Sequence, residues 1–103
     1  MRVVFSSEAE ADALSAFDFY EERSEGLGGR FRDHVGVALS RIQQSPEQSP
    51  IVYRNARRRL VERFPYAIIY RLYPGLVYVV ALMHARQNPA AWKRRRVIGN
   101  ERG

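Results

Sequence analysis

Three apolar segments in the second half of the chain predict β-strands. Residues 57–63, 66–73 and 76–84 are rich in Val, Ile, Leu and Tyr, and each is too short for a stable helix. The connectors Phe64-Pro65 and Pro74-Gly75 separate them. The pattern therefore predicts three consecutive antiparallel strands.

The expected pairing of these strands divides their side chains between two faces. If the second hairpin is symmetric about Pro74-Gly75, Leu72 faces Val77 and Ile68 faces Ala81. If Leu60 also meets Ile68, one side is apolar except for Arg58 and carries Leu60, Tyr66, Ile68, Tyr70, Leu72, Val77, Val79, Ala81 and Met83. The other side mixes apolar, basic and titratable groups: Arg57, Arg59, Ile69, Arg71, Tyr78, Val80, Leu82 and His84. A slip of one residue would invert these assignments.

The first half of the chain predicts two amphipathic helices. The first helix covers residues 8–23, after a capping box formed by Ser7 and Glu10. Its apolar stripe contains Ala9, Ala13, Ala16, Phe17 and Tyr20. The glycine-rich segment Ser24–Gly29 is expected to reverse the chain, and a second helix then runs to about Gln44. Its stripe contains Phe31, Val35, Ala38, Leu39 and Ile42.

Together these elements predict a two-layer α+β sandwich that forms one domain over residues 1–103. Residues 2–6 are expected to add a strand to the sheet. The helical hairpin would cover the apolar side of this mainly antiparallel, four-stranded sheet, and the mixed side would stay open. A helical turn is expected over residues 89–95, with Trp92 packed back and residues 93–96 exposed.

The charge of the chain is divided between its two halves. The net charge is +6, but residues 1–50 carry −4 and residues 51–103 carry +10. A basic half attracts phosphate or carboxylate partners, although binding to nucleic acid alone is expected to be weak and unspecific. The chain has no cysteine and no membrane-length apolar run. We therefore expect a soluble cytoplasmic protein, with no membrane association and no cofactor or metal.

Two fragments of the sequence carry a resemblance to a known family. They are Arg63-Phe64-Pro65-Tyr66 and His84-Ala85-Arg86-Gln87-Asn88-Pro89, and they occur on the fold expected above. Over residues 3 to about 96 the chain resembles the RelE/ParE superfamily of toxins from type II toxin-antitoxin operons. The resemblance implies a cognate acidic antitoxin as partner, and hence a hetero-oligomer.

The superfamily implies two possible activities. RelE-like members are ribosome-dependent mRNA endonucleases, and for that activity the candidate catalytic residues here are Arg59, Arg71, His84 and Arg86. Arginines would bind phosphate and His84 would move a proton. ParE-like members poison DNA gyrase without known enzymatic turnover. No tyrosine follows His84, so the C-terminal aromatic of the nuclease branch is missing, and the ending with Trp92 is more similar to the ParE-like branch.

The sequence hypothesis is therefore a ParE-like toxin that inhibits DNA gyrase, and whether the chain is an enzyme stays open between this branch and the RelE-like one. Residues implied in target inhibition are Trp92, Lys93, Arg94, Arg95 and Arg96. Residues expected to bind the antitoxin on the open face are Ile69, Arg71, Tyr78, Val80 and Leu82. Two alternatives stay open, a RelE-like nuclease acting on ribosome and mRNA, and a non-toxic module that binds nucleic acid or a partner. His84 and Trp92 each have a structural alternative, as a hydrogen-bonded histidine and as a packing anchor.

Overall fold

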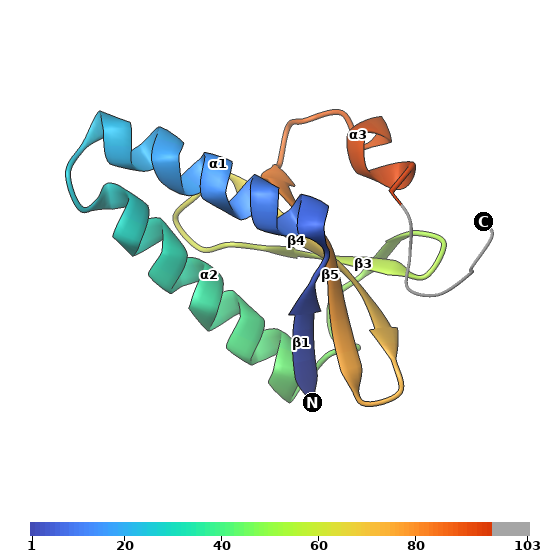
Figure 1. The fold of residues 1–103 in the computed structure, drawn as a ribbon. Coiled ribbons are helices and arrows are strands. Elements are labelled where there is room, and N and C mark those ends of the chain that lie inside the picture. The colour runs from blue at the N-terminus through green and yellow to red at the C-terminus, as the bar shows by residue number, and fades with distance from the viewer. Residues whose placement is uncertain (96–103) are drawn as a thin grey trace.

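The computed structural model describes residues 1–95, in which two long helices and a short one accompany a single five-stranded sheet (Figure 1). The elements follow the chain as β1 (Arg2–Phe5), α1 (Ser7–Arg23), α2 (Leu27–Gln44), β2 (Ile51–Tyr53), β3 (Ala56–Leu60), β4 (Tyr66–Tyr73), β5 (Leu76–His84) and α3 (Ala90–Lys93).

Helix α1 begins directly where β1 ends, and Ser6 makes the junction. Its backbone N–H donates to Val79 O, which continues the β1 ladder, and its side chain accepts a hydrogen bond from the Ala9 N–H at 3.0 Å. Ser6 is therefore the N-cap. The expected capping box at Ser7 and Glu10 is wrong by one residue, because the strand holds Ser6 in the extended conformation that a cap requires.

The turn between α1 and α2 is tighter than the glycine-rich segment suggested. Only Gly26 in this turn has a positive φ, of 86°, and α2 already begins at Leu27. Glu21, in the last turns of α1, accepts hydrogen bonds from the N–H groups of Gly26 and Gly28 at 2.9 and 3.0 Å. One carboxylate thus satisfies two free amides at the N-terminus of α2, where negative charge is also favourable.

The sheet has the strand order β1-β5-β4-β3-β2, with β1 parallel to β5 and all other pairs antiparallel. The sequence prediction missed β2, a three-residue edge strand that pairs irregularly with β3. Strand β3 also ends at Leu60 rather than residue 63, and Arg63 takes a positive φ of 68° in the turn before β4.

The predicted register holds near the Pro74-Gly75 turn and fails beyond it. Leu72 pairs with Val77 and Tyr70 with Val79, as expected, but a bulge then shifts the pairing so that Ile69 meets Ala81 and Ile68 meets Leu82. The extra residue in β5 reverses the faces of the residues that follow it. Strand β3 is also shifted by one residue, since Arg59 rather than Leu60 pairs with Ile68.

These shifts correct the predicted faces of several side chains. Leu82 belongs to the core beneath the helices, whereas Ala81 and Met83 belong to the second cluster on the opposite face. Arg57 and Arg59 pair with Tyr70 and Ile68, whose side chains lie in the helix-side core. Neither arginine shares a face with Arg71.

Helices α1 and α2 lie together on one side of the sheet, and α3 lies beside its other side (Figure 1). The main core fills the first interface with Ala9, Ala16, Phe31, Val35, Ala38, Ile42, Val61, Ile68, Tyr70, Val77, Val79 and Leu82. The two-layer α+β sandwich is thereby confirmed, with five strands instead of four. Within residues 1–95, no helix is both long and apolar enough to span a membrane.

Candidate functional site

Helix α3 is attached to the sheet by the burial of Trp92. This side chain is 6 % exposed and packs in the second cluster with Ala56, Ile69, Val80, Ala81 and Met83. Its ring meets Tyr53 edge to face, with 5.9 Å between the centroids, and Lys93 Nζ lies 4.7 Å from the centroid of the same tyrosine. Trp92 is thus a packing anchor, and α3 together with the Tyr53 side chain covers part of the face that was expected to be open.

That cover changes the exposure of the residues that were expected to bind the antitoxin. Ile69 and Val80 are 2 % and 0 % exposed, and Leu82 lies on the other face beneath the helices. Arg71 and Tyr78 pair across β4 and β5 on the covered side, where Arg71 is itself buried. The five residues therefore do not form an exposed apolar surface, because the β5 bulge removed one member and Trp92 covered two others.

The four nuclease candidates are not brought together. Arg59 lies on the helix side, beside His34 and Arg41 of α2, whereas Arg71 belongs to the opposite face. His84 pairs with Tyr66 on the helix side, with 5.6 Å between the ring centroids. Arg86 is exposed in the turn after β5. The prediction that the basic groups and His84 share one face is wrong, since both strand registers shifted.

Arg57, also expected on that face, has a structural role. Its guanidinium donates hydrogen bonds to the backbone oxygens of Glu47 and Ser49 at 2.8 and 2.7 Å. Tyr70, its partner in β4, donates from its hydroxyl to Pro46 O at 2.7 Å. The two side chains fasten the loop after α2 to the sheet.

His84 is held at the margin of an aromatic cluster. Its Nδ1 accepts a hydrogen bond from the Arg86 N–H at 3.1 Å. The cluster contains Tyr20, Phe31, Phe64 and Tyr66, with neighbouring centroids 4.9 to 5.9 Å apart. Partial burial raises the pKa of both Tyr20 and Tyr66, so these phenols stay neutral at ordinary pH.

A small cavity of about 110 Å³ lies between the sheet and α3. Its polar lining comes from Arg58, His84, Gln87 and Lys93, and its apolar lining includes Ile69, Met83 and Trp92. Basic side chains beside an aromatic ring can receive a small anion or a phosphate.

The basic C-terminal segment is only partly free. Lys93 and Arg94 are exposed, but the Arg95 side chain is 12 % exposed and forms an ion pair with Asp12 of α1. The hydrogen bond to Asp12 raises the pKa of Arg95. The expectation that all of residues 93–96 are exposed is therefore wrong for Arg95, and Arg96 lies outside the described residues. This pair was not predictable from the sequence, because its members are 83 positions apart.

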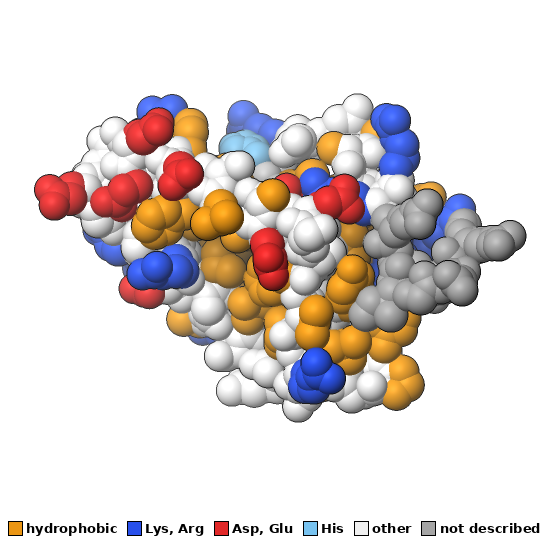
Figure 2. Space-filling model, in the orientation of Figure 1, with side chains coloured by type: hydrophobic (Ala, Val, Ile, Leu, Met, Phe, Trp, Pro, Cys, Tyr) orange, Lys and Arg blue, Asp and Glu red, His pale blue; other side chains and the backbone are white. Residues whose placement is uncertain are grey.

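A second exposed feature is an apolar groove between α1 and α2. It has a volume of about 220 Å³ and is lined by Ala13, Leu14, Phe17, Phe31, Arg32, Val35 and Leu82. Figure 2 shows hydrophobic side chains exposed along the two helices, with acidic side chains gathered toward the turn that joins them. Leu14 is 66 % exposed at this groove, which is unusual for a leucine that has apolar neighbours.

Comparisons with known proteins agree with this fold. The structure of the chromosomal ParDE TA system from P. aeruginosa is 18 % identical, has a TM-score of 0.69, and matches over 82 % of this chain and 95 % of that one. No curated protein sequence matches the chain. The family model described as the ParE toxin of the type II toxin-antitoxin system parDE matches residues 3–89. The chain therefore belongs to the ParE toxin family of type II toxin-antitoxin systems.

Proposed function

We propose that this toxin arrests bacterial growth in the cytoplasm by inhibiting DNA gyrase through its basic C-terminal segment. The residues assigned to this role are Trp92, Lys93, Arg94, Arg95 and Arg96. The observation that carries the proposal is the way α3 is built. Trp92 and Arg95 hold the segment in place, while Lys93 and Arg94 between them remain exposed.

The arrangement of the nuclease candidates supports an inhibitor rather than an enzyme. RNA cleavage requires a base, an acid and charge stabilisation around one phosphate. Arg59 and Arg71 lie on opposite faces of the sheet, so they cannot act on the same phosphate without a change of fold.

The alternative is a RelE-like ribosome-dependent nuclease, and one observation favours it. The cavity beside α3 is lined by Arg58, His84 and Lys93, so a phosphate held there by the two cations would lie near His84, although the imidazole ring packs against Tyr66 on the helix side. In that case the catalytic set would differ from the one suggested by the sequence. A non-toxic binding module is the third possibility, and it would have neither activity.

Two assays run side by side distinguish these functions. We expect the purified chain to inhibit supercoiling by DNA gyrase and to leave mRNA intact on programmed ribosomes. The double variant Lys93→Gln/Arg94→Gln should weaken inhibition about tenfold or more, because charged contacts contribute about 1.5–3 kcal/mol. His84→Ala is the matched control and should retain inhibition when circular dichroism shows that it is folded.

The opposite pattern would establish the nuclease. It consists of mRNA cleavage that falls about 10²-fold in His84→Ala, the loss expected for a general acid or base. Absence of both activities in a folded wild-type chain would leave the non-toxic module.

We also propose that the antitoxin binds in the α1–α2 groove rather than on the sheet. The groove is apolar and open, and Arg32 at its wall offers a partner for a carboxylate. An acidic, amphipathic segment of the antitoxin would fill it and form the hetero-oligomer.

Leu14→Glu tests this surface. We expect the variant to stay toxic while co-expressed antitoxin no longer restores growth, because the new carboxylate would repel an acidic segment and leave an unpaired charge in the groove. Val37→Glu is the control, since Val37 is 48 % exposed on α2 but does not line the groove. Equal rescue of both variants would exclude the groove as the antitoxin site.

A further inference from the structure

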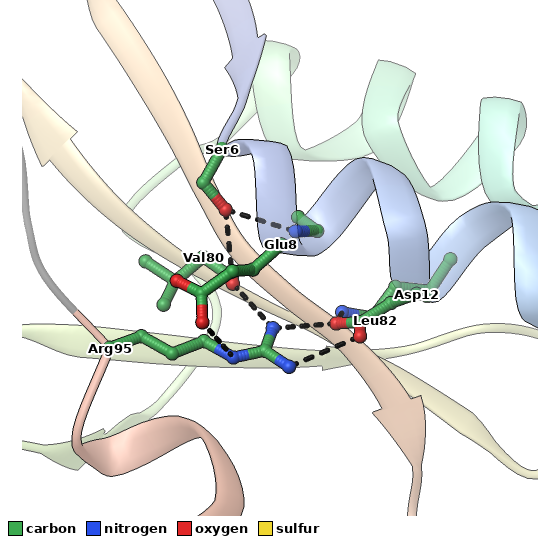
Figure 3. A network of polar contacts seen from close by, with 7 residues as sticks. Ser6, Glu8, Asp12, Val80, Leu82 and Arg95 are labelled. Carbon is green, nitrogen blue, oxygen red and sulfur yellow. Dashed lines mark hydrogen bonds and ion pairs between the residues drawn. The ribbon is translucent and has the colours of Figure 1, made fainter.

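One edge of the sheet is completed by side chains instead of a strand. Strand β1 pairs with β5 only as far as Phe5 and Val79, and Ser6 N–H then reaches Val79 O. Beyond this point the backbone of β5 meets three polar side chains (Figure 3). Val80 O accepts hydrogen bonds from Ser6 Oγ at 3.3 Å and from an Arg95 Nη at 2.9 Å, and Leu82 N–H donates to Asp12 Oδ2 at 3.0 Å.

Within this network Arg95 and Asp12 form a two-pronged ion pair. Arg95 Nη1 lies 2.7 Å from Asp12 Oδ2, and Nη2 lies 3.1 Å from Oδ1. Glu8 adds a second carboxylate, 3.6 Å from Arg95 Nε. The Asp12 and Arg95 side chains are only 16 % and 12 % exposed, so water screens their attraction less than it would on an open surface.

The ion pair connects helix α1 to the segment that follows α3. Asp12 belongs to the long helix α1, whereas Arg95 follows α3, which has only four residues. A helix of one turn is unstable without outside contacts. Trp92 supplies one such contact on the face of the sheet, and Arg95 supplies another at its edge.

The spacing of the two anchors determines where the exposed cations lie. Trp92 is buried and Arg95 is paired, so Lys93 and Arg94 occupy the short interval between two fixed points. Without Arg95, the segment would lose its anchor at the edge of the sheet and would be held only on the face, by Trp92 and by the contact of Lys93 with Tyr53.

We propose that Asp12 and Arg95 are a latch that positions the basic C-terminal segment for contact with the target. The proposal rests on the function proposed above, in which this segment inhibits gyrase. Arg95 is then a positioning residue that orients Lys93 and Arg94, and Asp12 takes part in inhibition although it lies on a different element.

Amide hydrogen exchange in the purified chain tests the latch without reference to toxicity. The reporters are the N–H groups of Trp92, Lys93 and Arg95, which are hydrogen-bonded within the α3 turn. Arg95→Gln and Asp12→Asn should each raise exchange there about tenfold or more, since a charge-assisted bond contributes at least that factor. Asn at position 12 keeps an oxygen acceptor for Leu82 N–H. Arg94→Gln removes the same charge from an exposed side chain and should leave exchange unchanged.

The double variant Asp12→Asn/Arg95→Gln measures the coupling between the two residues. If they act as one latch, exchange in the double variant matches that of Arg95→Gln alone, because Asp12→Asn removes no further contact of Arg95 once the guanidinium is gone. The proposal would be overturned if the increases in exchange rate caused by the two single variants multiplied in the double variant. It would also be overturned if the α3 amides of the wild type already exchanged at the unprotected rate.

Supercoiling inhibition by the same variants connects the latch to function. We expect Arg95→Gln and Asp12→Asn to require about tenfold more protein for half inhibition, while exposed Arg30→Gln on α2 matches the wild type. A wild-type chain that fails to inhibit gyrase would refute the proposed function and leave the exchange result standing. Increased exchange without any loss of inhibition would overturn the positioning role.

Discussion

At the scale of single residues, two glycines in α2 illustrate how position decides what a residue does. Gly28 lies where α2 crosses α1, and a Cβ there would be 2.7 Å from the Phe17 backbone oxygen and 3.0 Å from Glu21 Oε1. Gly36 lies farther along the same helix, and a Cβ there would have no heavy atom within 4 Å apart from its chain neighbours and the backbone of its own helix. The sequence suggested only that the first glycines interrupt the helix. The structure shows that Gly28 permits the close approach of the two helices.

We therefore expect Gly28→Ala and Gly36→Ala to have opposite effects on stability. Gly36→Ala should stabilise the protein by about 0.5–1 kcal/mol, because alanine has the higher helix propensity. Gly28→Ala should destabilise it by about 1–3 kcal/mol, since the methyl group meets backbone that must shift. Urea unfolding monitored by circular dichroism measures both changes. Equal stabilisation by the two variants would show that the helices separate at little cost.

Residues of the candidate site were predictable where burial alone decided their role. Trp92 was recognisable as an anchor because an isolated tryptophan near an apolar sheet packs readily. Arg95 was not distinguishable from Lys93 or Arg94 by sequence, since the three are neighbours of similar charge. Its partner Asp12 can reach Arg95 and the β5 backbone because β1 ends before β5 does and leaves that edge of β5 free.

At the scale of elements, the hydrophobic pattern predicted both long helices, β1, β4, β5 and, with a different end, β3. Their periodicity or apolar length was sufficient to identify them. The short α3 was expected only as a helical turn with Trp92 packed back. Strand β2 was missed because it has only three residues, Ile-Val-Tyr, which is too short to show an alternation of apolar and polar positions. Ile51 and Val52 are in fact exposed.

The bulge in β5 explains most of the error in the candidate site. Leu76 to Met83 is an uninterrupted apolar run, so either face of β5 can be buried and the sequence contains no sign of an extra residue. One inserted position moved Leu82 beneath the helices and Met83 to the α3 side. Function assignments that depend on which face a strand residue occupies are therefore the least predictable from sequence.

At the scale of the whole molecule, the division of charge along the chain becomes a division in space. Acidic side chains gather near the turn between α1 and α2, as Figure 2 shows, whereas Arg58, Lys93 and Arg94 belong to β3 and the α3 end. A surface of this kind attracts polyanions over a distance and orients them toward α3. Among the elements described within residues 1–95, none is a long basic helix of the kind that reads the major groove of DNA.

This arrangement leads us to expect weak DNA binding that depends strongly on salt and not on sequence. If about three cations contact phosphates, the affinity for a short duplex should fall roughly 40-fold between 50 and 200 mM salt, because each contact releases a counterion. Removing two of those cations in Lys93→Gln/Arg94→Gln should lower the salt slope by about 2. Fluorescence anisotropy with two unrelated duplexes measures both quantities. A complex that prefers one duplex and persists at physiological salt would contradict this expectation, and it would indicate that the protein recognises DNA directly rather than reaching it through gyrase.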